Sequence, residues 1–147
     1  MKYNLQHFVE DKELIKELLP LTNDHGRTRI GDQKYAPKIE RFLAGWKSGQ
    51  LRLVLARDEA TNKLVGYQVW GFHEMLFETG QRAVLGPIYL VPEYRGKDIK
   101  GFVNYGVDTM IILGAQDIRV ECDADQPTEQ IFARQGWTKM SVQMKRP

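Results

Sequence analysis

The chain has 147 residues, of which 42% are hydrophobic and 27% charged, and its formal net charge is +2. This size and composition are typical of one soluble globular domain, which we expect to span residues 1–147 and to be cytoplasmic. The balanced charge does not favour a nucleic-acid partner, and no apolar run approaches the roughly 20 residues that a membrane-spanning helix needs. A single cysteine excludes a disulfide framework, and three widely separated histidines do not predict a metal site.

A strand and a helix are predicted at the start of the chain. Residues 3–8 alternate apolar and polar side chains, which indicates a strand. Asp11 is a favoured residue before a helix, and apolar residues follow it at helical spacing until Pro20, which ends or bends the helix. Residues 22–34 are polar and contain two glycines, so they are predicted to form a loop.

A second helix and a group of strands follow. Residues 35–47 carry apolar side chains at helical spacing, and Gly49 is expected to end that helix. Short polar turns then separate three strands, which are predicted to pair as an antiparallel meander: 51–55, 64–72 and 83–91. Pro87 lies inside the third strand and cannot donate a ladder hydrogen bond, so a bulge or a splayed edge is expected there.

The second half of the chain alternates helices and strands. Residues 98–113 form the clearest predicted helix, and Gly114 is expected to end it. Residues 118–122 are predicted as a strand, 128–135 as a short helix and 139–145 as a last strand. The predicted order, β-α-α-β-β-β-α-β-α-β, indicates one α/β domain with a mixed sheet.

A locally basic stretch leads into the second predicted helix. It contains Arg27, Arg29, Lys34, Lys38 and Arg41. We interpret this stretch as a solvated helix face with its leading loop, because a nucleic-acid site needs clustered phosphate contacts. A nucleic-acid partner is therefore not expected.

The most informative segment is the turn between the third meander strand and the helix at residues 98–113. From Val91 to Lys97 it reads V-P-E-Y-R-G-K, so an apolar strand stops at a proline and a basic turn enters a helix. Free backbone N–H groups and the partial positive charge at a helix N-terminus favour an anion such as a phosphate. An ordinary strand-to-helix turn with solvated basic residues has the same local pattern, and both interpretations stay open.

This segment resembles the coenzyme-A-binding motif of the GNAT (N-acetyltransferase) superfamily, whose usual form is V-x-P-x-[YFW]-[RQ]-x-x-G-x-[GA]. The order of predicted elements also matches that fold across essentially the whole chain, and I-F-A-R-Q-G-W at residues 131–137 is similar to the family segment L-Y-E-K-L-G-F. The resemblance implies a GNAT-like acyl-CoA N-acyltransferase fold, an α/β fold with a mixed central sheet flanked by helices. It also implies acetyl-CoA as co-substrate.

The resemblance further implies which residues contact the coenzyme. The pyrophosphate would lie on the backbone amides of the turn, and the pantetheine would lie beside the end of the preceding strand. The implied cofactor-binding residues are Tyr89, Leu90, Val91, Arg95, Gly96, Lys97, Asp98, Ile99 and Lys100.

Positions in both motif segments depart from the family pattern. Asp98 stands where the first glycine of the phosphate loop is usual, and Lys100 stands at its second small residue. Asp98 is also a favoured N-cap residue, so its carboxylate is one candidate partner for the helix amides that would otherwise bind phosphate. Phe132 stands where the family often has a tyrosine that protonates the leaving thiolate, and we interpret it as a core aromatic.

The sequence does not identify a general base. The predicted strand at residues 83–91 carries no acid. Glu74 and Glu121 are the candidate catalytic residues, followed by Glu78 and His73, and for each of them a solvated strand-edge or turn position is the competing interpretation.

Two functional hypotheses follow from the motif and its departures. The first is an acyl-CoA dependent N-acyltransferase, of full or reduced activity, with a small-molecule or protein amine as acceptor. The second is a catalytically inactive copy of the same fold that acts as a structural or interaction module in a larger assembly, such as a phage particle. In that case a protein partner or a homo-oligomer is expected, with an apolar patch where the cofactor cleft would be.

Overall fold

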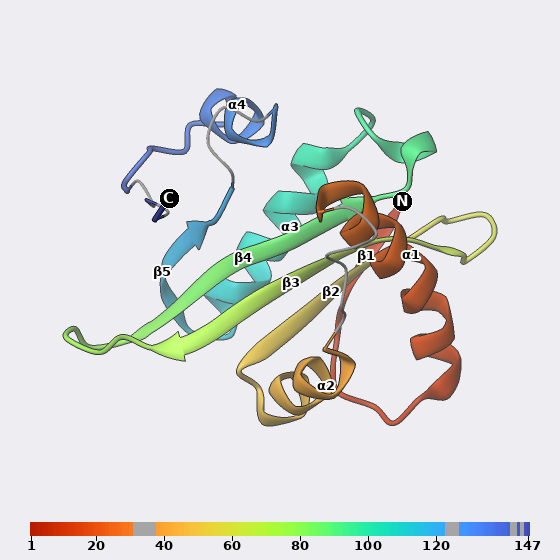
Figure 1. Cartoon of the computed structure of the whole chain (residues 1–147), viewed down its shortest axis with the longest axis horizontal. Helices are drawn as coiled ribbons and strands as arrows, with labels where there is room; N and C mark the ends of the chain where they lie inside the picture. Colours follow the sequence, from red (N-terminus) through yellow and green to blue (C-terminus); the bar gives the residue numbers. More distant parts are fainter. Residues whose placement is uncertain (31–37, 123–126, 142–143, 145) are drawn as a thin grey trace.

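A five-stranded sheet with helices on both faces forms the centre of the molecule (Figure 1). The computed structural model describes residues 1–30, 38–122, 127–141, 144, 146 and 147. In chain order the elements are β1 (Lys2–Gln6), α1 (Lys12–Ile30), α2 (Ile39–Ser48), β2 (Leu51–Arg57), β3 (Leu64–Glu74), β4 (Gln81–Leu90), the short 3-10 helix η1 (Pro92–Tyr94), α3 (Ile99–Ile112), β5 (Ala115–Val120) and α4 (Pro127–Arg134).

The sheet is mixed, as the sequence predicts. Its strands follow the order of the chain, β1-β2-β3-β4-β5. The first four strands are antiparallel to their neighbours, whereas β5 is parallel to β4. Parallel neighbours require a crossover connection, and α3 provides it on the face of the sheet opposite to α1 and α2 (Figure 1).

Apolar side chains fill both faces of the sheet. On one face, Phe102 brings α3 against the strands. On the other face, Leu14 of α1 and Trp46 of α2 pack on them. Successive side chains of a strand point to opposite faces, so Tyr89 belongs to the core under α1 and α2, and Leu90 belongs to the core under α3.

Helix α1 is longer than the sequence predicts. It begins after Asp11, whose Oδ1 accepts a hydrogen bond from the N–H of Glu13 at 2.9 Å, as expected of an N-cap. The loop predicted over residues 22–34 is wrong for residues 22–30, because α1 continues through Pro20 to Ile30. A proline removes one helix hydrogen bond and bends the axis without necessarily ending the helix. Figure 1 shows the bend, beyond which the C-terminal half of α1 crosses over the sheet.

The other helices begin and end near their predicted positions. Gly49 adopts the left-handed conformation after α2, with φ of 83°. The predicted start of that helix at residue 35, and residues 31–34 of the predicted loop, lie outside the described residues. None of the helices in the described part of the chain combines the length and the hydropathy that crossing a bilayer requires.

The last predicted strand, at residues 139–145, is not found in the described residues. Residues 139–141 and 144 belong to no strand, and residues 142, 143 and 145 lie outside the description. The alternation that suggested a strand does not reflect burial, since Met140 is 71% exposed and Met144 93%. Strand formation depends on packing against cross-strand neighbours, and in the described part of the chain these residues pair with no strand.

Candidate functional site

Strands β4 and β5 separate halfway along β4. Their parallel pairing runs from Gln81, opposite Ala115, to Leu85, opposite Val120. One further hydrogen bond joins the N–H of Glu121 to the carbonyl of Leu85 at 3.0 Å. Beyond Leu85 the described residues show no pairing between the two strands, so the sheet opens into a fork with its vertex at Leu85.

An ion cluster lies in the closed half of the fork. The Nε of Arg82 on β4 lies 2.8 Å from Oδ2 of Asp117 on β5, and Nη2 of Arg119 lies 3.1 Å from the same oxygen. The hydrogen bonds from Arg119 and Arg82 hold the pKa of Asp117 below its ordinary value. The pair of Arg82 and Asp117 therefore adds a side-chain contact between β4 and β5 to their backbone pairing.

A β-bulge lies at the vertex. The register of β3 and β4 shifts between Gln68 and Trp70, so that Gly86 and Pro87 of β4 stand opposite a single residue of β3. This confirms the irregularity that the sequence predicts at Pro87. A bulge bends its strand and breaks pairing locally, and here it coincides with the point where β5 leaves β4.

Past the bulge, the free edge of β4 presents backbone groups to the fork. The N–H of Val91 donates to the carbonyl of Val65 at 2.8 Å, so the peptide groups of Val91 face β3. Alternation along the strand turns those of Ile88 and Leu90 toward the opposite edge, from which β5 has separated. The Nε of Arg95 donates to the carbonyl of Leu90 at 2.9 Å, which agrees with this direction.

The turn from β4 into α3 is closed by its own backbone. The N–H of Tyr94 donates to the carbonyl of Val91 at 3.0 Å, and the N–H of Lys97 donates to the carbonyl of Tyr94 at 3.3 Å. Gly96 has φ of 81°, a conformation that favours glycine. The side chains of Lys97 and Lys100 are exposed, whereas that of Arg95, although also exposed, folds back toward the end of β4, where its Nε bonds to the carbonyl of Leu90.

The start of α3 leaves a group of backbone donors without acceptors. In the described part of the chain, no acceptor is found for the N–H groups of five residues of the turn and first helical turn: Gly96, Asp98, Ile99, Lys100 and Gly101. Unpaired N–H groups at a helix N-terminus, together with the helix dipole, favour an anion. The backbone therefore offers the arrangement that the sequence predicts for a phosphate.

Asp98 occupies the N-cap position but does not cap α3 with its side chain. Its carbonyl accepts the hydrogen bond from the N–H of Phe102 at 3.0 Å, whereas its carboxylate makes no capping hydrogen bond. The hydroxyl of Tyr3 on β1 instead donates to Oδ2 of Asp98. The interpretation in which this carboxylate satisfies the helix amides is therefore wrong.

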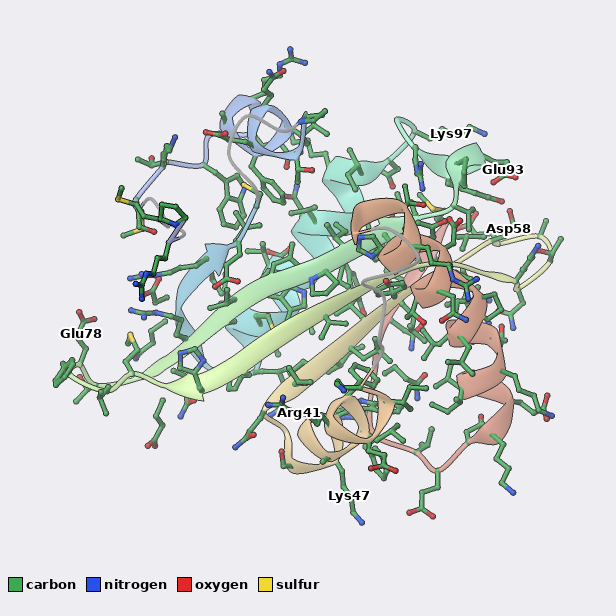
Figure 2. All side chains as sticks on the ribbon, in the orientation of Figure 1. Arg41, Lys47, Asp58, Glu78, Glu93 and Lys97 are labelled. Atoms are coloured by element: carbon green, nitrogen blue, oxygen red, sulfur yellow. The ribbon has the colours of Figure 1, made fainter. Side chains whose placement is uncertain are left out.

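A second tyrosine–carboxylate bond attaches the turn to the β2–β3 connection. The hydroxyl of Tyr94 donates to Asp58, whose Oδ1 also accepts from the N–H of Thr61 at 2.8 Å and of Ala60 at 2.9 Å. These bonds lower the pKa of Asp58 to about 2, and the bond from Tyr94 contributes most. Figure 2 shows Asp58 at the same end of the molecule as Lys97.

Acid should weaken this attachment, because the bond from Tyr94 stabilises the charged form of Asp58. The pKa of Asp58 is lower in the folded chain than its ordinary value of 3.8, so its contribution to stability is present above about pH 4 and is lost as the pH falls toward 2. We expect the melting temperature of Asp58→Asn to fall less than that of the wild type between pH 5 and pH 2. Thermal melts over this range test it, with Asp108→Asn, an exposed aspartate on α3, as control. If the melting temperatures of wild type and Asp58→Asn fall in parallel with pH, the contribution assigned to charged Asp58 is wrong.

The C-terminal half of α1 covers the sheet just past the bulge. The hydroxyl of Tyr89 donates to Asp24, and Nδ1 of His25 lies 2.7 Å from the hydroxyl of Tyr67. The rings of His25 and Tyr89 stack with 5.3 Å between centroids, and the guanidinium of Arg95 lies 5.2 Å from the centroid of Tyr89. Burial, together with the bond to Asp24, raises the pKa of Tyr89, so its hydroxyl keeps its proton at neutral pH.

Sequence reasoning missed Asp24, His25 and Tyr3 as neighbours of the site. The first two fell in the predicted loop, although Leu18, Leu21 and His25 recur at helical spacing and could have extended the helix past Pro20. Nothing in the local sequence marks Tyr3, because 95 positions separate it from Asp98.

The structure brings one of the two candidate acids to the fork. Glu121 lies at the vertex, where its N–H bonds to Leu85, and its side chain is exposed. Glu74 ends β3 opposite Gln81, roughly 13 Å along the strand from the vertex at about 3.3 Å per residue. Glu78 lies at the tip of the β3–β4 hairpin, at the end of the molecule away from the β4–α3 turn (Figure 2).

Phe132 is a core residue, as interpreted from the sequence. It is 4% exposed, and its ring packs edge-on against Trp137 with 5.3 Å between centroids. Its position in α4 therefore contributes packing to the core under α3 and offers no proton to a leaving group.

A cavity of about 650 Å³ lies away from the fork. Its lining comes from α1, α2 and the segment between β1 and α1, and includes Phe8, Ile15 and Leu43. None of its lining residues belongs to the β4–α3 turn or to β5. The cavity is therefore separate from the candidate site.

Comparisons with solved structures identify the fold. A GNAT family acetyltransferase from Staphylococcus aureus covers 100% of this chain and 99% of its own, with a TM-score of 0.69 and 16% identity. An aminoglycoside acetyltransferase from an uncultured soil metagenomic sample, in complex with sisomicin, covers 99% and 95%, with a TM-score of 0.74 and 14% identity. A ribosomal-protein-alanine N-acetyltransferase from Brucella melitensis covers 98% and 100%, with a TM-score of 0.69 and 15% identity.

No protein-family model matches the sequence. No curated protein gives a significant match either. The structural likeness extends over essentially the whole chain, and the mixed sheet with its flanking helices agrees with the fold that the sequence predicts. The chain therefore has the fold of the GNAT acetyltransferases.

Proposed function

We propose that the chain is an acyl-CoA dependent N-acyltransferase that uses acetyl-CoA and an amine acceptor. The observation that carries the proposal is the fork between β4 and β5, which opens directly beside a basic turn whose backbone amides have no acceptor in the described residues. An extended, anionic ligand such as coenzyme A fits an arrangement of this kind. Unpaired amides bind its phosphates, and an open strand edge can accept its amide-containing arm.

We assign the phosphate contacts to the turn and to the first turn of α3. The amides of Gly96, Asp98, Ile99 and Lys100 have no competing acceptor in the described residues, and exposed Lys97 adds a full charge beside them. The side chains of Arg95 and Lys100 are exposed at the same turn and are the other basic contacts. We assign the pantetheine to the open edge of β4 beside Tyr89, Leu90 and Val91.

Acetyl-CoA supplies the acetyl group as a thioester. In the transfer, the neutral amine nitrogen forms a bond to the carbonyl carbon, the carbon–sulfur bond breaks, and the proton lost by nitrogen passes to solvent or to the departing thiolate. We assign the N–H of Ile88, which the bulge turns toward the fork, as the donor to the carbonyl oxygen on which negative charge develops. Positioning and this one donor are the contributions that the backbone makes.

We assign the acceptor amine to the opening between β4 and β5 on the face of the sheet that α1 covers. Asp24 is an exposed carboxylate there, and it lies beside Tyr89, whose strand borders the fork. A carboxylate attracts a protonated amine before the amine loses its proton. We assign the carboxylate of Glu121, at the vertex, as the general base that receives that proton, directly or through water.

The alternative, an inactive copy of the fold acting as an interaction module, lacks the observation that would favour it. This alternative predicts an apolar patch where the cofactor cleft would be. Among the described residues, the most exposed large apolar side chains of the sheet and α3 are instead Leu76, Phe77 and Ile112. The first two lie in the β3–β4 hairpin and the third at the end of α3, away from the β4–α3 turn.

Calorimetry with acetyl-CoA tests the proposal. We expect saturable binding, followed by thiol release when an amine is added. The names of the structural neighbours suggest two acceptors to try, sisomicin and an alanine-containing peptide of a ribosomal protein. Glu121→Gln should lower the turnover rate and leave the affinity for acetyl-CoA unchanged, whereas Glu74→Gln should change neither. If no binding is detected at millimolar acetyl-CoA, the proposed function is wrong.

A further inference from the structure

The Asp98 carboxylate lies next to the amides that it could cap, yet it makes no capping bond. Aspartate is among the residues most favoured at the N-cap, where its oxygen accepts from the second or third N–H of the helix. In α3 these are the N–H groups of Lys100 and Gly101, and neither has an acceptor in the described residues. Some other interaction must therefore hold the carboxylate.

That interaction comes from the opposite edge of the sheet. The hydroxyl of Tyr3 on β1 donates to Oδ2 of Asp98. Gly101 provides the room, because a Cβ at that position would overlap the Asp98 carboxylate. β1 is the edge strand farthest from β5, so the carboxylate is drawn away from the side on which the fork opens.

Tyr3 itself is held rigidly. It pairs with Ala56 of β2, and its ring stacks on Phe102 with 5.2 Å between centroids and 24° between planes. Tyr105 packs against the same ring at 5.5 Å. Burial and the bond to Asp98 raise the pKa of Tyr3, so the hydroxyl stays protonated and remains a donor throughout the physiological range.

We propose that Tyr3 is a positioning residue, which holds the Asp98 carboxylate off the N-terminal amides of α3 and so leaves them open to an anionic ligand. The inference rests on the proposed function, because it assigns those amides to the phosphates of coenzyme A. It explains how a carboxylate can stand in the phosphate-binding turn without blocking it. Without the Tyr3 hydroxyl, Asp98 caps Lys100 and Gly101, and the ligand must displace it.

A double-mutant cycle of Tyr3→Phe and Asp98→Ala tests the inference. Phenylalanine keeps the ring stack on Phe102 and removes only the hydroxyl. A capping hydrogen bond is worth about fivefold in an equilibrium constant, so Tyr3→Phe should weaken coenzyme A binding by about fivefold. On the Asp98→Ala background, the same change should have no effect. Tyr105→Phe, which removes a hydroxyl from the neighbouring ring, is the matched control and should bind like wild type.

Amide hydrogen exchange gives a readout that needs no ligand. In Tyr3→Phe the N–H groups of Lys100 and Gly101 should exchange about fivefold more slowly than in wild type, since Asp98 now caps them. In the double variant this protection should be absent. Unchanged exchange in Tyr3→Phe would overturn the role of Tyr3, as would an equal loss of coenzyme A affinity on both backgrounds. If the protection appears but no variant binds coenzyme A, the role of Tyr3 stands and the proposed function fails.

Discussion

Replacing Lys97 and Lys100 together by glutamate is expected to weaken coenzyme A binding on the order of a hundredfold. Both side chains are exposed at the turn whose amides are assigned to the phosphates, so each substitution exchanges an attraction for a repulsion. A charge-assisted hydrogen bond is worth about 1.5–3 kcal/mol, and solvent screening reduces this at exposed positions. Calorimetry at low and at high salt measures the effect, which should shrink as salt is added.

The matched control for this prediction is Arg41→Glu with Lys47→Glu. This pair changes the net charge by the same amount, and both residues lie on α2, away from Lys97 (Figure 2). If the two double variants lose affinity equally, the effect is one of overall charge, and the assignment of the turn is wrong. Unchanged affinity in the Lys97 and Lys100 variant would likewise remove the turn from the binding site.

Replacing Trp70 by alanine is expected to lower the free energy of unfolding by about 4–8 kcal/mol. Trp70 is completely buried in β3, opposite Leu85 at the vertex of the fork. Losing a buried tryptophan side chain costs about 3–5 kcal/mol. Its Nε1 also donates to Oε1 of Gln68 at 2.8 Å, and an unpaired buried oxygen adds about 1–3 kcal/mol. Urea unfolding followed by circular dichroism measures the change.

Two comparison variants separate the loss of packing from the loss of the hydrogen bond to Gln68. Trp70→Phe keeps most of the ring volume and leaves Gln68 without its donor, so it should cost less than alanine but still about 1–3 kcal/mol. Phe77→Ala removes an aromatic ring that is 94% exposed, and should change the stability by less than about 0.5 kcal/mol. A cost for Trp70→Ala no larger than that for Phe77→Ala would contradict the packing that the structure assigns to this strand.

The fold could be predicted because its elements carry their periodicity locally. The spacing of apolar residues predicts strands β2 and β3 and helix α3, and a glycine marks the end of α2. The two errors have opposite causes. In α1, Pro20 predicts an end of the helix, but the apolar spacing continues past it and the helix follows that spacing. At residues 139–145, the alternation predicts one buried face, but Met140 and Met144 are exposed.

The candidate site could be predicted only where it is local in sequence. The turn from Val91 to Lys97 carries its glycine, its basic side chains and its helix start in one short motif. The contacts that modify it come from distant strands and helices: Tyr3 approaches Asp98 across 95 positions, and Asp58 approaches Tyr94 across 36. A motif gives the identity of such residues but not the partner that each side chain finds.

The open half of β4 also affects how copies of the chain behave toward one another. A strand edge with unpaired peptide groups is a template for pairing with a second chain, and so a risk for aggregation. Among the described residues the unpaired stretch is short, running past Leu85 only to the end of the strand at Leu90. Pro87 has no N–H to offer, and the carbonyl of Leu90 already accepts from Arg95. The edge of β4 can therefore stay open to a small molecule, while few of its backbone groups are free to pair with a strand of a second chain.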